Sequence, residues 1–175
     1  MNLKDYIRSI QDYPKKGILF RDITTLIKNE KAFTKCVDEI VDRSKKFKFK
    51  KIAAIESRGF VFASAVSYLL KKPFILLRKQ NKLPAETHSV EFELEYGKAI
   101  MEIHKDSIEQ NESVLLIDDL IATGGTAEAA AKLIEISKGK VAGFIFVINL
   151  FDLGGCDNLV KKGHKVENLI EFPGH

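Results

Sequence analysis

Apolar residues along this chain gather in short runs that are separated by segments of mixed polarity. Runs rich in valine, isoleucine and leucine, bounded by polar residues, are typical of strands that are buried on both faces. Strands with one exposed face would instead alternate apolar and polar positions. The pattern predicts strands at Lys51–Ile55, Pro73–Leu77, Gly97–Ile103, Ser113–Ile117 and Val141–Asn149.

Segments between these runs carry apolar residues at helical spacing. In one of them, Phe33, Val37, Ile40 and Val41 share one face of a helix. Helices that connect buried strands are typical of a parallel sheet, because the chain must return to the same end of the sheet. The sequence therefore predicts an α/β fold: a mainly parallel twisted sheet flanked by helices, with ligands at the carboxyl ends of the strands. The predicted helices are Leu3–Ile10, which is ended by the breaker Pro14–Gly17, Phe33–Phe47, Gly59–Leu70 and Thr126–Ser137.

Length and composition limit the fold and the compartment. A chain of 175 residues with 45% hydrophobic residues is expected to form a single domain over residues 1–175. The N-terminal segment is too charged for a signal peptide, and the longest apolar run, Ala142–Leu150, is far shorter than the roughly 20 residues of a membrane-spanning helix. Cys36 and Cys156 lack the spacing of a metal site, and two reduced thiols fit a cytoplasmic protein without a membrane partner.

The charge of the chain is mildly positive. A net charge of +4 fits a protein that binds an anion. The segment Lys45–Lys51 interleaves lysines with Phe47 and Phe49, a pattern that can contact nucleic acid. We favour a second interpretation, in which both phenylalanines pack inward and the lysines stay in water, so no nucleic-acid partner is expected.

The strongest chemical signal lies in Val114–Thr126, with the sequence VLLIDDLIATGGT. The segment predicts a buried strand, two carboxylates at the strand end (Asp118 and Asp119), a glycine loop and the start of a helix. Free N–H groups at a helix N-terminus attract phosphate, and glycines let the backbone approach an anion closely. Because two nearby carboxylates suit sugar hydroxyls or a metal ion, the segment indicates a phosphorylated ribose as ligand. The expected phosphate-binding residues are Ala122, Thr123, Gly124, Gly125 and Thr126, the last as helix N-cap.

Motifs of several other enzyme classes are missing from the sequence. No lysine follows the glycines as in a P-loop, and there is no GxGxxG motif of a dinucleotide-binding fold. His88, His104 and His164 lack zinc-binding spacing such as HExxH, and no GxSxG motif indicates a serine nucleophile. The acidic pair and the glycine loop are thus the main candidate site.

The segment Val114–Thr126 resembles the phosphoribosyl-diphosphate (PRPP) motif of the type I phosphoribosyltransferases. The resemblance implies transfer of 5-phosphoribosyl from PRPP to N9 of adenine, which gives AMP and diphosphate in purine salvage. It extends in order over nearly the whole chain, because further motifs are similar to the adenine-specific branch of that family. These motifs are GILFRDIT (Gly17–Thr24), ESRGF (Glu56–Phe60), LRKQNKLP (Leu77–Pro84), LEYG (Leu94–Gly97), NLFDLGG (Asn149–Gly155) and, as in bacterial members, FPGH (Phe172–His175).

For the donor, the resemblance implies a diphosphate bound with Mg²⁺, which is held mainly by the diphosphate and has no assigned protein ligand. The family has a flexible lid at the polar stretch Arg78–Ser89, which would close over the diphosphate and exclude water. An ordinary solvated loop is the alternative. Gln80-Asn81 stands where relatives often carry Lys-Gly or Pro-Gly, although asparagine tolerates the backbone of a tight turn. The expected diphosphate-binding residues are Arg58, Arg78, Lys79 and Lys82.

For the acceptor, the resemblance implies a small N-terminal hood built from residues 1–30. In this hood Phe20 would stack on adenine, while the backbone of Leu19 and Arg21 would read the edge of the base. The alternative for Phe20 is a place in the core. The resemblance also implies a homodimer.

The catalytic residues implied by the resemblance are Glu95, Tyr96, Asp118 and Asp119. Glu95 would act as acid or base on the imidazole side of adenine as the bond to N9 forms. Two positions depart from many relatives: Phe92 replaces a tyrosine, and Ala63 replaces a glycine.

Two other functions stay open at this point. One is the same transfer to another base, such as hypoxanthine, guanine, xanthine or orotate, against which GILFRD and LEYG argue. The other is a regulator that binds PRPP without catalysis, although the sequence contains no helix-turn-helix pattern.

Overall fold

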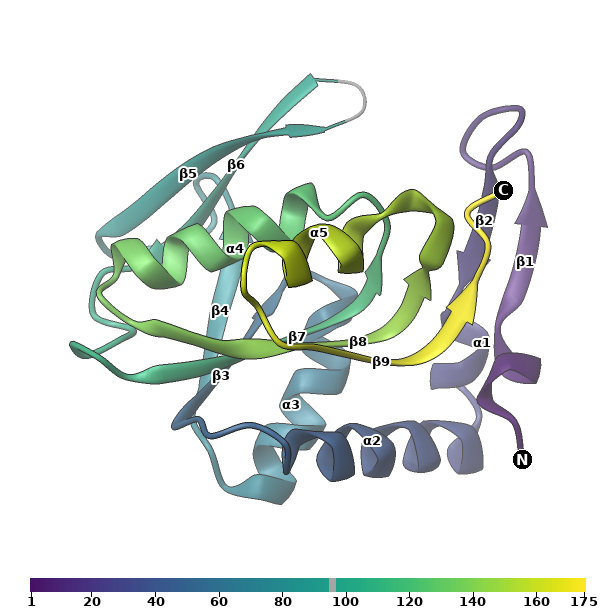
Figure 1. Cartoon of the computed structure of the whole chain (residues 1–175), viewed down its shortest axis with the longest axis horizontal. Helices are drawn as coiled ribbons and strands as arrows, with labels where there is room; N and C mark the ends of the chain where they lie inside the picture. The colour runs from purple at the N-terminus through teal and green to yellow at the C-terminus, as the bar shows by residue number, and fades with distance from the viewer. Residues whose placement is uncertain (95–96) are drawn as a thin grey trace.

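A seven-stranded sheet forms the centre of the computed structural model, which describes residues 1–94 and 97–175 (Figure 1). The strand order is β5-β6-β4-β3-β7-β8-β9. Strands β4, β3, β7, β8 and β9 run parallel, and the β5–β6 hairpin joins β4 in the antiparallel sense. The strands are β3 (Lys51–Ile55), β4 (Phe74–Lys79), β5 (Thr87–Leu94), β6 (Gly97–His104), β7 (Ser113–Ile121), β8 (Lys140–Leu150) and β9 (Val166–Phe172).

Helices cover both faces of this sheet. Helices α2 (Glu30–Ser44) and α3 (Arg58–Leu70) pack on one face, while α4 (Gly125–Ile136) and α5 (Gly155–Lys161) lie on the other (Figure 1). Shorter helical turns are η1 (Leu3–Tyr6), α1 (Thr24–Ile27) and η2 (Phe151–Leu153). The predicted α/β fold with a mainly parallel sheet between helices is confirmed.

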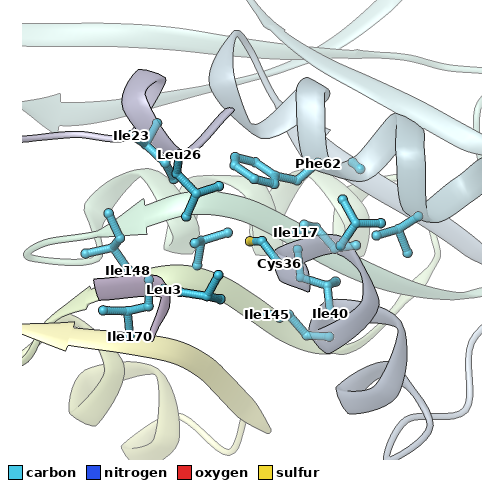
Figure 2. Packing of buried hydrophobic residues seen from close by; sticks show 14 of the residues in the cluster. Leu3, Ile23, Leu26, Cys36, Ile40, Phe62, Ile117, Ile145, Ile148 and Ile170 are labelled. Atoms are coloured by element: carbon cyan, nitrogen blue, oxygen red, sulfur yellow. The ribbon is translucent and has the colours of Figure 1, made fainter. Parts of the chain in front are cut away.

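The core consists of two apolar layers, one on each side of the sheet. Figure 2 shows the layer beneath α2 and α3, where Cys36, Ile40 and Phe62 meet Ile117 and Ile145 of the central strands. The second layer lies under α4. Strands β7 and β8 contribute to both layers, which explains why their sequences are apolar runs. Phe47 is also buried in the first layer, as predicted.

A separate two-stranded sheet contains the N-terminal residues. Strand β1 (Arg8–Gln11) pairs antiparallel with β2 (Leu19–Asp22). The prediction of a helix over Leu3–Ile10 is therefore wrong beyond Tyr6, where η1 ends. Pairing with β2 determines this conformation, and Arg8 Nε donates to Asp22 Oδ2 at 3.0 Å across the two strands.

Other elements of the large sheet and its connections also differ from the sequence prediction. Strand β7 continues past Ile117 to Ile121, because it keeps pairing with β8 after its pairing with β3 has ended. The stretch Arg78–Ser89 is not one loop, since its ends belong to β4 and β5 and the segment between them spans residues 80–86. Strands β2, β5 and β9 and helices α1 and α5 were not predicted.

Candidate functional site

A cleft of about 420 Å³ opens at the carboxyl ends of β3 and β7. These neighbouring strands continue in opposite directions through the sheet, β3 by way of α3 to β4 and β7 by way of α4 to β8. Such a switch point leaves a crevice between the two connections, which is the usual ligand site of an open α/β sheet. We call it the central cleft. It is lined by Ile55–Arg58, Lys79, Asp118–Ala127 and Phe146.

The acidic pair lies inside β7, not after its end as predicted. Pairing with β3 stops at Ile117, so Asp118 and Asp119 extend beyond the neighbouring strand and line the central cleft. Asp118 Oδ1 accepts a hydrogen bond from the Asp119 N–H at 2.8 Å. Burial, together with the charge of Asp119, raises the pKa of Asp118 well above its ordinary value.

The first residues of α3, Arg58 and Gly59, lie close to this acidic pair. Arg58 Nε donates to Asp119 Oδ2 at 2.6 Å, an ion pair whose carboxylate side chain is 10% exposed. The next residue is Gly59, and a Cβ there would lie 2.7 Å from Asp118 Oδ1. A larger residue would press on the Asp118 carboxylate, while the β7 backbone would stay at ordinary contact distance, 3.4 Å at Ile117 O. The predicted position of Arg58 at a helix entry is confirmed.

The glycine loop leads from β7 into α4 on the other side of the central cleft. Gly124 has φ +94°, a left-handed conformation that favours glycine, and it is the N-cap of α4. Thr126 lies inside the helix, so its prediction as N-cap is wrong. The loop is supported from behind by Gly155, whose N–H donates to Ala122 O at 3.1 Å. All five predicted phosphate-binding residues, Ala122–Thr126, line the cleft.

Glu56, at the end of β3, contacts the other predicted diphosphate-binding residues, Arg78, Lys79 and Lys82. Its Oε1 accepts the Lys79 N–H at 2.7 Å and lies 3.5 Å from Arg78 Nε, while its Oε2 lies 3.4 Å from Lys82 Nζ. Burial alone would raise the pKa of Glu56, but the Lys79 hydrogen bond and the charges of Lys82 and Arg78 lower it overall. Lys79 and Glu56 line the cleft, whereas Arg78 and Lys82 are not among its lining residues. Glu56 was not among the residues predicted for the site.

A second buried carboxylate holds the segment between β4 and β5. Glu102 of β6 accepts the Asn81 N–H at 2.6 Å and the Thr87 hydroxyl, so it is bonded near both ends of residues 80–86. Asn81 has φ 66°, which confirms that this asparagine adopts the left-handed conformation of a turn. Sequence analysis missed Glu102, although a lone glutamate within an apolar strand was the available signal.

The two-stranded sheet reaches the central cleft through Phe20. Arg58 Cζ lies 5.9 Å from the centre of the Phe20 ring, and Tyr13 packs against the same ring edge-to-face. Phe20 is only partly buried and is not part of either core layer, which argues against the core alternative. Leu19 and Arg21 flank it on β2.

Two further predictions concern the remaining catalytic residues and the metal. Glu95 and Tyr96 lie outside the described residues. Among residues 1–94 and 97–175, no cluster of three or more His, Cys, Asp or Glu side chains forms a metal site.

Comparison with known proteins identifies the family to which the chain is similar. Residues 22–171 match the model of the phosphoribosyl transferase domain. The chain is 77% identical to the adenine phosphoribosyltransferase of Pelagibacter ubique, over the full length of both proteins. The crystal structure of adenine phosphoribosyltransferase from Thermoanaerobacter pseudethanolicus superposes with a TM-score of 0.93 at 45% identity, covering 97% of this chain and 98% of that one. A Saccharomyces cerevisiae adenine phosphoribosyltransferase, complexed with an imino-altritol bisphosphate and adenine, gives a TM-score of 0.88 at 33% identity and 96% coverage of both chains.

Proposed function

The chain belongs to the adenine phosphoribosyltransferases, and from that membership we propose how its residues share the work of the reaction. The enzyme is a pentosyltransferase that moves 5-phosphoribosyl from PRPP to N9 of adenine and produces AMP and diphosphate. One observation carries the proposed roles: a glycine loop, two carboxylates and Arg58 line one cleft, and the ring of Phe20 lies beside it.

The loop Ala122–Thr126 binds the 5-phosphate of PRPP. It precedes and enters α4, a helix of 12 residues, whose first N–H groups have no acceptor within the helix. These groups and the helix dipole attract a phosphate, and the hydroxyls of Thr123 and Thr126 add further donors.

Asp118 and Asp119 bind the ribose hydroxyls. Positive charge develops on the ribose ring as the bond to diphosphate breaks, as in other glycosyl transfers. Carboxylates fixed beside the ring stabilise this charge without having to reorient. The ion pair with Arg58 holds Asp119 in place.

The leaving diphosphate is bound by Arg58 and Lys79 in the central cleft, with Arg78 and Lys82 as further cations. Before the anion arrives, Glu56 balances the charges of Arg78 and Lys82. The pair Asp118 and Asp119 also fits a Mg²⁺–diphosphate complex, because Mg²⁺ commonly takes one or two carboxylates together with phosphate oxygens. When bound, Mg²⁺ neutralises charge on the departing diphosphate.

Adenine lies in the hood formed within residues 1–30, stacked on Phe20. Within residues 1–94 and 97–175, strand β2 pairs with β1 alone, so its other edge offers backbone N–H and C=O groups. Adenine presents a donor at N6 and an acceptor at N1, whereas a 6-oxopurine reverses both, so the backbone of Leu19 and Arg21 can select adenine. Glu95 is our candidate acid or base for N9, on the basis of the sequence.

We also propose a homodimer that works in the cytoplasm. Tyr68, 84% exposed, and Leu69 on α3, with Leu76 on β4, present apolar side chains that support a protein interface. Cys36 and Cys156 are both free, which supports a reducing compartment. No helix in the described part of the chain is long and apolar enough to cross a membrane.

A panel of bases tests the substrate assignment. Purified protein is mixed with PRPP and Mg²⁺, and adenine, hypoxanthine, guanine, xanthine or orotate is supplied singly while the nucleotide formed is quantified. We expect AMP from adenine alone, and loss of turnover when Mg²⁺ is chelated. Turnover of a different base would overturn the role of Leu19–Arg21, whereas PRPP binding without any turnover would favour a PRPP-sensing regulator.

A further inference from the structure

The C-terminal residues Phe172–His175, which we call the tail, lie against the hood. Strand β9 ends at Phe172, which is 6% exposed, and the chain then continues beside β2 (Figure 1). No role in the reaction described above falls to these residues.

Arg21 attaches the hood to the tail. Its guanidinium lies over the Phe172 ring, with Cζ 4.4 Å from the ring centre, and its Nη2 donates to Pro173 O at 3.2 Å. The Nη1 atom donates to Ser9 Oγ at 2.5 Å, within the same two-stranded sheet. Successive side chains of a strand point to opposite faces. Phe20 faces Arg58 and the central cleft, so the side chain of Arg21, the next residue on β2, points to the opposite face and contacts the tail.

Gly174 attaches the tail to the segment that supports the phosphate loop. Its N–H donates to Asp152 Oδ1 at 2.5 Å, and a Cβ at this position would lie 2.6 Å from Leu153 Cγ. Both partners belong to η2, which leads directly to Gly155 behind the glycine loop. The tail is thus wedged between the hood and the support of the phosphate loop.

We propose that the tail is a positioning element for the acceptor base, with Arg21 and Gly174 as its positioning residues. It fixes the separation between β2, which carries Phe20, and the phosphate loop, which holds the 5-phosphate of PRPP. The proposal rests on the proposed function, because it takes the hood as the adenine site. A hood that shifts would misalign adenine N9 with the ribose carbon that it attacks, while the PRPP residues themselves stay in place.

Two variants perturb the tail from its two ends. Arg21→Lys keeps the backbone and the charge but loses the planar donor pair and the stacked guanidinium. Gly174→Ala adds a methyl group that collides with Leu153 and displaces the tail. Arg43→Lys is the matched control: Arg43 Nη1 donates to Glu167 Oε2 at 2.8 Å, a contact between α2 and β9 that lies outside the hood and the tail.

Initial rates are measured with adenine and PRPP varied separately, together with the thermal midpoint of each variant. We expect Arg21→Lys and Gly174→Ala each to raise the KM for adenine about tenfold, because a displaced hood weakens the stacking and the backbone hydrogen bonds that hold the base. For both variants the KM for PRPP and the thermal midpoint should stay near wild type, and Arg43→Lys should match wild type in both KM values. The double variant should be no worse than the poorer single variant, because both break one connection.

Equal rises in both KM values, or effects that multiply in the double variant, would overturn the proposal. So would an unchanged KM for adenine in both single variants while the wild type makes AMP. A wild type that makes no AMP from adenine and PRPP would instead refute the proposed function, so the two failures are distinguishable.

Discussion

Gly59 leaves no room for a larger side chain beside Asp118. In Gly59→Ala the new Cβ would lie 2.7 Å from Asp118 Oδ1, whereas ordinary van der Waals contact begins near 3.4 Å. The carboxylate or the start of α3 must therefore retreat by about 0.7 Å. Either movement displaces a group that we assign to the ribose or to the diphosphate.

The size of the effect follows from this displacement. Misplacement of about 1 Å costs roughly 10²-fold in rate, so a shift somewhat smaller than this should lower kcat/KM by about 10- to 100-fold. That range corresponds to about 1.4–2.7 kcal/mol of transition-state stabilisation. Overpacking costs about 1–3 kcal/mol of stability, but alanine in place of glycine regains up to about 1 kcal/mol within a helix. Catalysis should therefore suffer more than folding.

The assay compares kcat/KM for AMP formation with the free energy of unfolding in urea. Gly139→Ala is the matched control, because a Cβ there would lie 2.8 Å from Ile108 Cγ2, an equally tight contact outside the central cleft. We expect Gly139→Ala to lose stability and to keep its kcat/KM.

Two results would refute this reasoning. A Gly59→Ala enzyme with kcat/KM within twofold of wild type would show that Asp118 can move without consequence for the reaction. An equal loss of activity in Gly139→Ala would trace the effect to general destabilisation.

Four other substitutions test the site and the hood. Asp118→Asn and Asp119→Asn should each lower kcat at least about 10²-fold with little change in thermal midpoint, and near-wild-type rates in both would remove these residues from the mechanism. Arg78→Ala should mainly raise the KM for PRPP; steady-state kinetics with PRPP varied will show an unchanged value if this side chain does not reach the diphosphate. The pKa of Asp22 is lowered from 3.8 to about 2, chiefly by the Thr24 hydroxyl and further by Arg8, although burial opposes the shift. The ionised carboxylate therefore stabilises the fold above pH 3.8, and this contribution is lost as the pH falls through about 2. Urea unfolding should show Asp22→Asn about 2 kcal/mol less stable than wild type at pH 7, with a gap that closes between pH 4 and pH 2; a gap independent of pH would contradict the assignment.

The parallel sheet was predictable because its strands are buried on both faces. Burial of this kind demands continuous apolar runs, and β3, β7 and β8 have them. Strand β5 was missed although Val90 and Phe92 alternate with charged residues, since the stretch before it is polar and was interpreted as one loop. Strand β1 was missed because its conformation depends on pairing with β2, and local spacing of apolar residues does not show a distant partner.

The phosphate loop was predictable for a different reason. Its chemistry is local: the acidic pair, the glycines and the helix start are adjacent in sequence. The roles of Glu56 and Glu102 could not be predicted in this way. Each carboxylate binds residues that are more than 20 positions away or on another strand. The same holds for the contact between Arg21 and Pro173, which are 152 residues apart.

The hood shares no strand pairing with the large sheet in the described parts of the chain. Its ladder of backbone hydrogen bonds is therefore separate from the one that holds β7 in the large sheet. The hood, which selects the base, and the central cleft, which binds PRPP, are therefore separate parts of one chain. Exchanging residues 8–22 for another short hairpin could redirect the phosphoribosyl group to a different base, while the donor chemistry is inherited unchanged.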